Sequence, residues 1–145
     1  MPGITVGIDG SAHSTYALEW AMKEAAFRHA PVTVLTVHAV PMSPWTGNPY
    51  TLPADADDVQ KAQQAAEELT LKVTSQLDIA QPSSVTVRAI SGFPAQALIE
   101  ASRTADLLVV GSRGAGGFAR LMIGSVSSQV VHHAHCPVVV VPSES

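Results

Sequence analysis

Several residue types whose abundance often reveals function are scarce in this 145-residue chain. Its single cysteine, Cys136, excludes an internal disulfide bond and favours a reducing compartment. Eight basic residues stand against twelve acidic ones, and the net charge of −4 argues against a nucleic-acid-binding surface. No apolar run approaches the roughly 20 residues of a membrane span, and no signal-peptide pattern opens the sequence. We therefore expect a cytoplasmic protein that contacts neither nucleic acid nor a membrane.

Charged residues are also few, at 14%, whereas hydrophobic residues make up 46% of the chain. This balance suits a domain whose central strands are buried on both faces. The length is sufficient for one core that needs neither disulfides nor metal. Because the sequence shows no internal repeat or domain boundary, residues 1–145 are predicted to form a single domain.

Strand and helix patterns alternate along the whole chain. Short apolar, β-branched segments predict five strands, at residues 3–9, 32–40, 84–90, 106–110 and 137–142. Apolar residues at every third or fourth position predict helices at residues 15–30, 59–77, 92–103 and 125–135. The proline-rich residues 41–53 have no period and predict a loop. This alternation is typical of an α/β domain with a parallel sheet and helices on both faces.

A glycine-rich segment, GSRGAGGFARLMIGS at residues 111–125, follows the fourth predicted strand. In such sheets, ligands bind beyond the carboxyl ends of the strands, where the strand order reverses. If the first and fourth strands are neighbours at that point, the GIDGS segment at residues 7–11 faces the same crevice. A nucleotide is the ligand that we expect there.

Three phosphate-binding patterns can be compared with the glycine-rich segment. The G-x-x-x-x-G-K-[ST] loop is excluded, because no lysine follows Lys72. A G-x-G-x-x-A dinucleotide pattern occurs at residues 114–119, but no acidic residue ends the next strand, so we interpret it as a chance match. The third pattern, G-x-x-G-x(9)-G-[ST], fits at Gly111, Gly114, Gly124 and Ser125.

The third pattern has a physical basis. Gly111 and Gly114 would let the backbone pass close to phosphates, and Ser125 opens a helix whose free N–H groups and dipole favour an anion. Arg113 and Arg120 add positive charge to the same segment. The alternative is a tight turn followed by a serine that only caps its helix.

Three segments together resemble the universal stress protein family. GSRGAGGFARLMIGSVSSQVVHHAHCPVVVVP resembles the family's C-terminal signature. VGIDGSAHSTYALEWA resembles its first strand and helix, and SGFPAQALIEAS resembles the entry to its third helix. The resemblance implies a Rossmann-like domain of the adenine nucleotide alpha hydrolase-like type, with a five-stranded parallel sheet in the order 3-2-1-4-5. An intact G-x-x-G-x(9)-G-[ST] pattern marks the family members that bind ATP.

The same resemblance implies a site for ATP, with Mg²⁺. Asp9 matches the aspartate that contacts the nucleotide near ribose and adenine, and Ala39 matches the position whose backbone reads the adenine edge. An alternative for Asp9 is a carboxylate that caps the first helix. The nucleotide-binding residues expected are Asp9, Gly10, Ser11, Ala39, Gly111, Ser112, Arg113, Gly114, Gly124, Ser125, Val126 and Ser127.

Metal binding and catalysis find little support in the sequence. In the HHAHC segment, His132 and His133 would point about 100° apart on a helix, so we interpret the segment as structural and predict no metal site. Cys136, beside a buried strand, is expected to be a small core residue. No dedicated base is evident and no catalytic residue is predicted, although bound Mg²⁺ and positioning alone would give slow ATP hydrolysis.

The last predicted strand raises a question of assembly. Four valines lie between Pro137 and Pro142, and at a sheet edge they would leave backbone groups unpaired. The family resemblance implies a homodimer that pairs this strand across a two-fold axis; the alternative is a monomer whose own loop covers the edge. The sequence thus predicts an ATP-binding, regulatory stress-response homodimer. The alternatives are a slow ATPase, a cyclic-AMP-binding protein, and a dimerisation module that binds no nucleotide.

Overall fold

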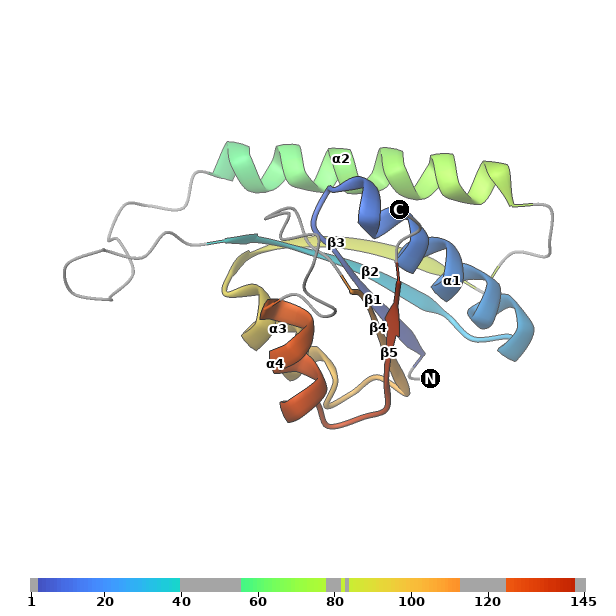
Figure 1. Cartoon of the computed structure of the whole chain (residues 1–145). Helices are drawn as coiled ribbons and strands as arrows, with labels where there is room; N and C mark the ends of the chain where they lie inside the picture. The colour runs from blue at the N-terminus through green and yellow to red at the C-terminus, as the bar shows by residue number, and fades with distance from the viewer. Residues whose placement is uncertain (1–2, 40–55, 78–81, 83, 113–124, 143–145) are drawn as a thin grey trace.

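A five-stranded parallel sheet forms the centre of the computed structural model, which describes residues 3–39, 56–77, 82, 84–112 and 125–142 (Figure 1). The strand order is β3-β2-β1-β4-β5, as predicted. The strands are β1 (Ile4–Ile8), β2 (Val32–Ala39), β3 (Val85–Gly92), β4 (Leu107–Gly111) and β5 (Val138–Val141). The helices are α1 (Ala12–Arg28), α2 (Ala56–Gln76), α3 (Pro94–Ala101) and α4 (Ser125–His133). The predicted loop at residues 41–53 lies outside the described residues.

In the described part of the chain, two helices cover each face of the sheet (Figure 1). Buried side chains of α1 and α2, such as Leu18 and Val73, form one core cluster with the strands. Leu98 of α3 and Val130 of α4 belong to a second cluster on the opposite face. Since the chain uses one face from β1 to β3 and the other from β3 to β5, the strand order reverses between β1 and β4. This is the switch point of a doubly wound sheet.

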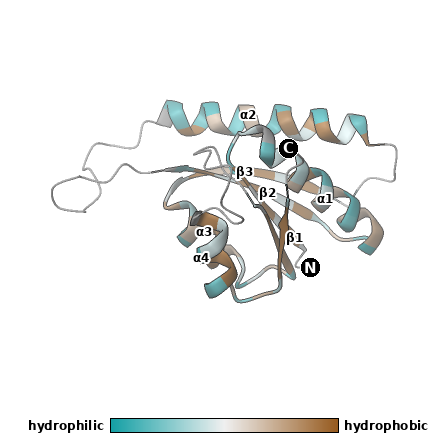
Figure 2. Ribbon diagram, viewed as in Figure 1, coloured by the Kyte–Doolittle hydropathy of each residue, from teal (hydrophilic) through white to brown (hydrophobic). Residues whose placement is uncertain are grey.

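The central strands are apolar on both faces because helices cover both. Along β4, Leu107 and Val109 join the first core cluster, whereas Leu108 and Val110 join the second. Figure 2 shows the hydrophobic colouring of these strands between helices whose outer surfaces are largely hydrophilic. Each fully buried aliphatic side chain contributes about 1.5–3 kcal/mol relative to its exposed state.

Leu98 of α3 packs against β1 at position 7, which is glycine. A Cβ atom at Gly7 would lie 2.8 Å from Cδ2 of Leu98, a distance that real Cβ atoms essentially never show. The helix begins at Pro94, a residue type favoured in the first turn because its ring fixes φ near the helical value. It starts two residues later than predicted, because β3 continues through Gly92.

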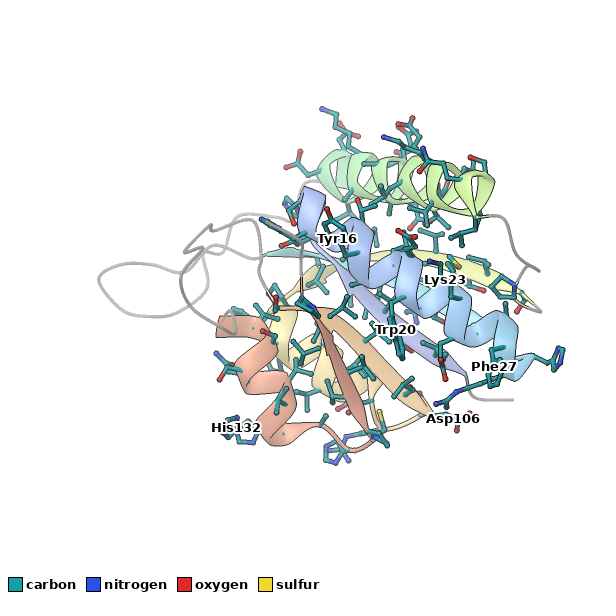
Figure 3. All side chains as sticks on the ribbon, turned by 45° about the vertical axis from the view of Figure 1, so that its right-hand side comes forward. Tyr16, Trp20, Lys23, Phe27, Asp106 and His132 are labelled. Atoms are coloured by element: carbon teal, nitrogen blue, oxygen red, sulfur yellow. The ribbon has the colours of Figure 1, made fainter. Side chains whose placement is uncertain are left out.

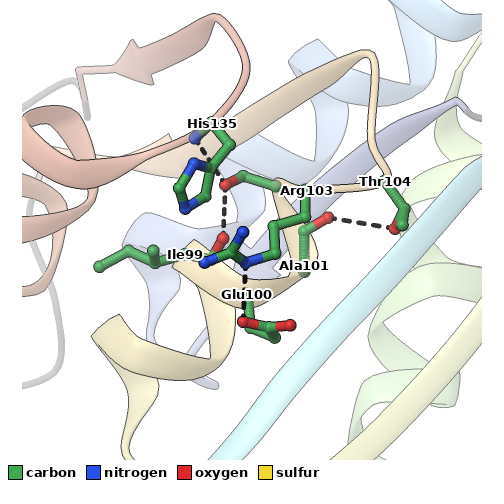
Figure 4. Close-up of polar contacts among 7 residues, drawn as sticks. Ile99, Glu100, Ala101, Arg103, Thr104 and His135 are labelled. Atoms are coloured by element: carbon green, nitrogen blue, oxygen red, sulfur yellow. Dashed lines mark hydrogen bonds and ion pairs between the residues drawn. The ribbon is translucent and has the colours of Figure 1, made fainter.

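The end of α3 is joined to the segment between α4 and β5 by Ser102, a residue only 1% exposed. Its hydroxyl donates to the carbonyl of Ile99 and accepts the N–H of His135 at 2.9 Å. Figure 4 shows these contacts beside the exposed Arg103–Glu100 ion pair. One buried hydroxyl thereby fixes the relative positions of two segments that are far apart in sequence.

Helix α1 ends at Arg28, two residues before the end predicted from the sequence at residue 30. The reason is His29, which adopts the left-handed conformation (φ 56°) and directs its N–H to the carbonyls of Ala25 and Ala26. Figure 3 shows side chains along α1, where Phe27 near this end is 81% exposed. The C-terminal end of α1 is therefore set by a left-handed turn at a residue that is not glycine, which the sequence does not signal.

Candidate functional site

The carboxyl ends of β1 and β4 meet at the switch point. Val6 of β1 pairs with Val109 of β4, and both strands end two residues later, at Ile8 and Gly111. The residues that follow β1 therefore emerge beside the end of β4. This placement confirms that the first and fourth strands are neighbours, which was the condition for a shared crevice.

Asp9, the first residue after β1, is exposed and held by the start of α1. Its Oδ1 accepts hydrogen bonds from the Ser11 N–H at 2.9 Å, the Ser11 hydroxyl at 2.6 Å and the Ser14 hydroxyl at 2.6 Å. The Asp9 N–H in turn donates to Ser14 Oγ at 2.9 Å. The carboxylate thus has a defined orientation at the edge of the sheet.

Ser11 occupies the N-cap position of α1, but its hydroxyl does not form a side-chain capping bond. It donates to Asp9 instead. The intervening Gly10 has φ 82°, a left-handed conformation that favours glycine, and a Cβ there would meet no atom within 4 Å. The turn from strand to helix therefore depends on a glycine backbone and on serine donors around one carboxylate.

β2 and β3 extend farther in the same direction than β1. Ile8 pairs with Thr36, and Ala39 lies three residues beyond, about 10 Å at the usual rise of a strand. Ala39 pairs with Gly92, the last residue of β3. The backbone of Ala39 is thus placed beyond the end of β1, on the side of the switch point formed by β2.

His38 is the next-to-last residue of β2, and its side chain faces the start of α2. Its Nε2 is 3.9 Å from Oδ2 of Asp58, and both side chains are substantially exposed. A contact of this length between exposed groups adds little to stability.

At the end of β4, Gly111 still belongs to the sheet and pairs with Val141. Ser112 is 8% exposed, and its N–H donates to the carbonyl of Val141 at 2.9 Å. That N–H therefore extends the ladder between β4 and β5.

Helix α4 begins at Ser125, the last position of the glycine pattern. The side chain of Val126 packs against the second core cluster, and Ser127 is 3% exposed. Core packing thus anchors the first turn, at the end of the helix where the dipole favours an anion. The predicted site residues Arg113, Gly114 and Gly124 lie outside the described residues.

Cys136 and the neighbouring histidines form a separate region. Burial raises the pKa of the Cys136 thiol, a backbone hydrogen bond with Leu108 partly offsets this, and the Asp106 carboxylate raises the pKa further. These effects disfavour the reactive thiolate. Within the described ranges, no three His, Cys, Asp or Glu residues are grouped in a way that could hold a metal ion.

Ser14 is the functional candidate that sequence reasoning missed. It is 5% exposed and forms two hydrogen bonds with Asp9, one through the carboxylate and one through the backbone. A serine five residues after an aspartate at a strand end is a weak signal, because many helices carry serine in their first turn. Only the fold shows that the hydroxyl returns to the aspartate.

The fold and the residues at its carboxyl edge define a doubly wound α/β domain with a polar switch point between β1 and β4. The family model for the universal stress protein family matches residues 2–142. A universal stress protein of Mycolicibacterium smegmatis is 36% identical over 139 residues, which cover 96% of this chain and 47% of that protein. The chain belongs to the universal stress protein family.

Other relatives agree with this assignment. Universal stress protein Rv2623 of Mycobacterium tuberculosis is 36% identical over 146 residues, covering 98% of this chain and 48% of its own length. The chain thus spans about half the length of the curated relatives it matches. The solved universal stress protein UspA from Lactobacillus plantarum is similar in fold, with a TM-score of 0.76 at 24% identity and 97% of each chain covered.

Two further solved structures contain nucleotides. A universal stress protein in complex with cAMP aligns with a TM-score of 0.67 at 24% identity, covering 99% of this chain and 98% of that one. The protein from Archaeoglobus fulgidus in complex with dAMP aligns with a TM-score of 0.63 at 20% identity, covering 97% of both chains.

None of the helices that the structure describes here combines the length and the apolar character needed to cross a bilayer.

Proposed function

We propose that this chain binds an adenine nucleotide, as ATP with Mg²⁺, at the switch point, and that the bound nucleotide regulates a homodimer rather than undergoing rapid turnover. The observation that carries the proposal is the pairing of Val6 with Val109 in the sheet, which brings the ends of β1 and β4 side by side. One end bears the Asp9 carboxylate, and the other leads into the glycine pattern that ends at the start of α4.

Each end would recognise a different part of the nucleotide. The Asp9 carboxylate, held by two serines, is suited to accept hydrogen bonds from ribose hydroxyl groups. The backbone of Ala39, beyond the end of β1, would contact the adenine edge. The phosphates would lie between the glycine-rich segment and the first turn of α4, where the helix dipole favours an anion. The residues proposed for this last role are Gly111, Ser112, Arg113, Gly114, Gly124, Ser125, Val126 and Ser127.

The residues present are compatible with Mg²⁺ that enters on the nucleotide. Mg²⁺ commonly keeps several waters and binds through substrate phosphates with one or two carboxylates. At the end of β1 the carboxylate is Asp9, whose Oδ1 already accepts three hydrogen bonds from serines. The ion would therefore be held mainly by the phosphates, whose charge it would offset, while the protein holds the nucleotide through the contacts above.

The nucleotide complexes of related proteins support this choice of ligand class. A relative binds cAMP and another binds dAMP, so the fold accommodates adenine nucleotides with one phosphate. The intact G-x-x-G-x(9)-G-[ST] pattern favours a longer phosphate chain in this protein, because it combines three glycines and a helix start in one segment.

We further propose that the homodimer forms through β5. The carbonyls of Pro137 and Val141 accept N–H groups from the β4 side, so the backbone groups of Val138 and Val140 face the open edge. A two-fold axis beside Val139 would place Val138 opposite Val140 of a second copy. Each such pair can exchange two backbone hydrogen bonds.

Calorimetry on nucleotide-stripped protein tests nucleotide binding. ATP with Mg²⁺, AMP and cyclic AMP are titrated into the wild type, Gly114→Asp and Gly124→Asp, with Lys23→Ala on the distant surface of α1 as the control. Saturable ATP binding that both aspartate variants lose, with unchanged circular dichroism, is the expected result. Tighter binding of cyclic AMP would replace the triphosphate assignment, and no heat or thermal stabilisation with any nucleotide would overturn the proposal.

A further inference from the structure

A glutamine of α2 contacts the backbone of the outer strand β3. Gln63 Nε2 donates to the carbonyl of Val87 at 2.7 Å, and Gln63 Oε1 accepts the N–H of Ala89 at 2.6 Å. Nε2 also donates to Oε1 of Glu67, one turn farther along α2, at 2.8 Å. Both amide hydrogens and the amide oxygen are thus engaged, so the carboxamide has one orientation.

The two backbone groups that Gln63 contacts point away from the sheet. Since the carbonyl of Ser84 accepts the N–H of Val32, even-numbered residues of β3 direct their backbone groups toward β2. The odd-numbered Val87 and Ala89 therefore direct theirs toward the outer edge. A further parallel strand would place one residue opposite Arg88, donating to the carbonyl of residue 87 and accepting from the N–H of residue 89. The carboxamide of Gln63 makes this same pair of bonds.

The β3 edge would otherwise be a site for strand addition. β3 has eight residues and ends the sheet on its side, whereas β5 at the opposite end has four. Long exposed edges pair readily with other chains unless a charge, a bulge or a covering element prevents it. Arg88 is the one charged residue of β3, and α2 crosses beside this strand. Figure 1 shows α2 extending over the side of the sheet that β3 and its neighbour β2 form.

We infer that Gln63 takes the place of a strand residue at the centre of the β3 edge, and so confines strand-to-strand association with a second copy of this chain to the β5 edge. The inference rests on the proposed dimer in one respect: that dimer identifies β5 as the edge through which the chain associates. The side-chain amide of Gln63 satisfies one backbone acceptor and one backbone donor in the middle of β3, the longer edge strand. Removing the amide leaves both groups available to a second β3 strand.

The test compares variants by sedimentation velocity over a range of concentrations and by amide hydrogen exchange at Ala89. Gln63→Ala removes the carboxamide, and Gln63→Met removes it while retaining length and helix propensity in case alanine impairs folding. Gln64→Ala, at the exposed next position of α2, is the matched control. Both Gln63 variants should form assemblies larger than the wild type as concentration rises, with exchange at Ala89 about tenfold faster. Gln64→Ala should match the wild type.

Adding Val140→Pro distinguishes association through β3 from association through β5, because it removes a backbone donor from the β5 edge. Val140→Pro alone should be monomeric, whereas Gln63→Met combined with Val140→Pro should associate through β3. A wild type that is monomeric would contradict the β5 dimer, yet self-association of the Gln63 variants would still support the role of Gln63. If both Gln63 variants retain the wild-type mass distribution, the inference is overturned whatever the exchange rate at Ala89.

Discussion

Ser14 and Asp9 hold each other across the first turn of α1. The Ser14 hydroxyl donates to Asp9 Oδ1 at 2.6 Å and accepts the Asp9 N–H at 2.9 Å. The serine is 5% exposed, whereas the carboxylate that it holds is at the surface. A buried residue of the helix therefore orients a polar group at the switch point, where the nucleotide is proposed to bind.

Ser14→Ala should lower both stability and nucleotide affinity. It removes one hydrogen bond to a charged group and leaves the Asp9 N–H without its present partner, which should reduce the free energy of unfolding by about 1–3 kcal/mol. Urea denaturation measures this change, and Thr15→Ala on the same helix is the control. If Ser14 acts on the nucleotide through Asp9, Ser14→Ala should weaken ATP binding in the wild type but not in an Asp9→Ala background. Equal weakening in both backgrounds would contradict that role.

Gly7→Ala should destabilise the fold through Leu98. The added Cβ would lie 2.8 Å from Leu98 Cδ2, so α3 or its leucine must shift, and overpacking of this kind costs about 1–3 kcal/mol. A double-mutant cycle with Leu98→Ala provides the measurement, because truncating the leucine removes the clash. The cost of Gly7→Ala should shrink in that background, and a cost that stays the same would contradict the role of the contact with Leu98.

The Cys136 thiol should react slowly in the native protein. Burial and the Asp106 carboxylate raise its pKa above the ordinary value, so less thiolate is present near neutral pH than in the unfolded chain. Iodoacetamide labelling followed across pH should rise at higher pH in the native state than in urea. Asp106→Asn should move the native profile toward lower pH, and an unchanged profile would exclude the charge effect.

The same shift predicts a pH dependence of stability. The native state retains the thiol proton to a higher pH than the unfolded state does, so the contribution is complete below the unfolded pKa. It is lost as pH rises from the unfolded pKa through the folded pKa of Cys136. Urea unfolding in this alkaline range should therefore show a decline that Cys136→Ala reduces, and an identical decline in that variant would assign it to other groups.

Val140→Pro should dissociate the proposed dimer without disrupting the sheet. The N–H of Val140 faces the open edge, since the ladder to β4 uses Pro137, Val139 and Val141, and proline is tolerated where an edge N–H points outward. Val140→Ala keeps the N–H and is the matched control. Sedimentation equilibrium should give a monomer for the proline variant and a dimer for the alanine variant, whereas two dimers of equal affinity would place the interface elsewhere.

The sequence determined the class of fold because hydrophobic pattern and turn residues are local properties. Uninterrupted apolar segments predicted buried parallel strands, and their alternation with helical periodicity led to the doubly wound sheet that the structure confirms. The family resemblance supplied the strand order 3-2-1-4-5. Boundaries were less accurate where backbone conformation decided them, as at His29, whose left-handed turn ends α1.

Contacts between distant segments were decided only by the tertiary structure. Sequence reasoning identified Asp9 and Ser11 but not Ser14, because the return of that hydroxyl to Asp9 depends on how α1 leaves β1. Likewise, nothing near Gln63 indicates that its carboxamide pairs with the backbone of β3, more than twenty residues away. The sequence by itself therefore determined which elements form and which polar residues end the strands. The tertiary structure decided which side chains meet there and which backbone groups of β3 Gln63 contacts, since hydrogen bonds between segments require a specific packing that local pattern does not encode.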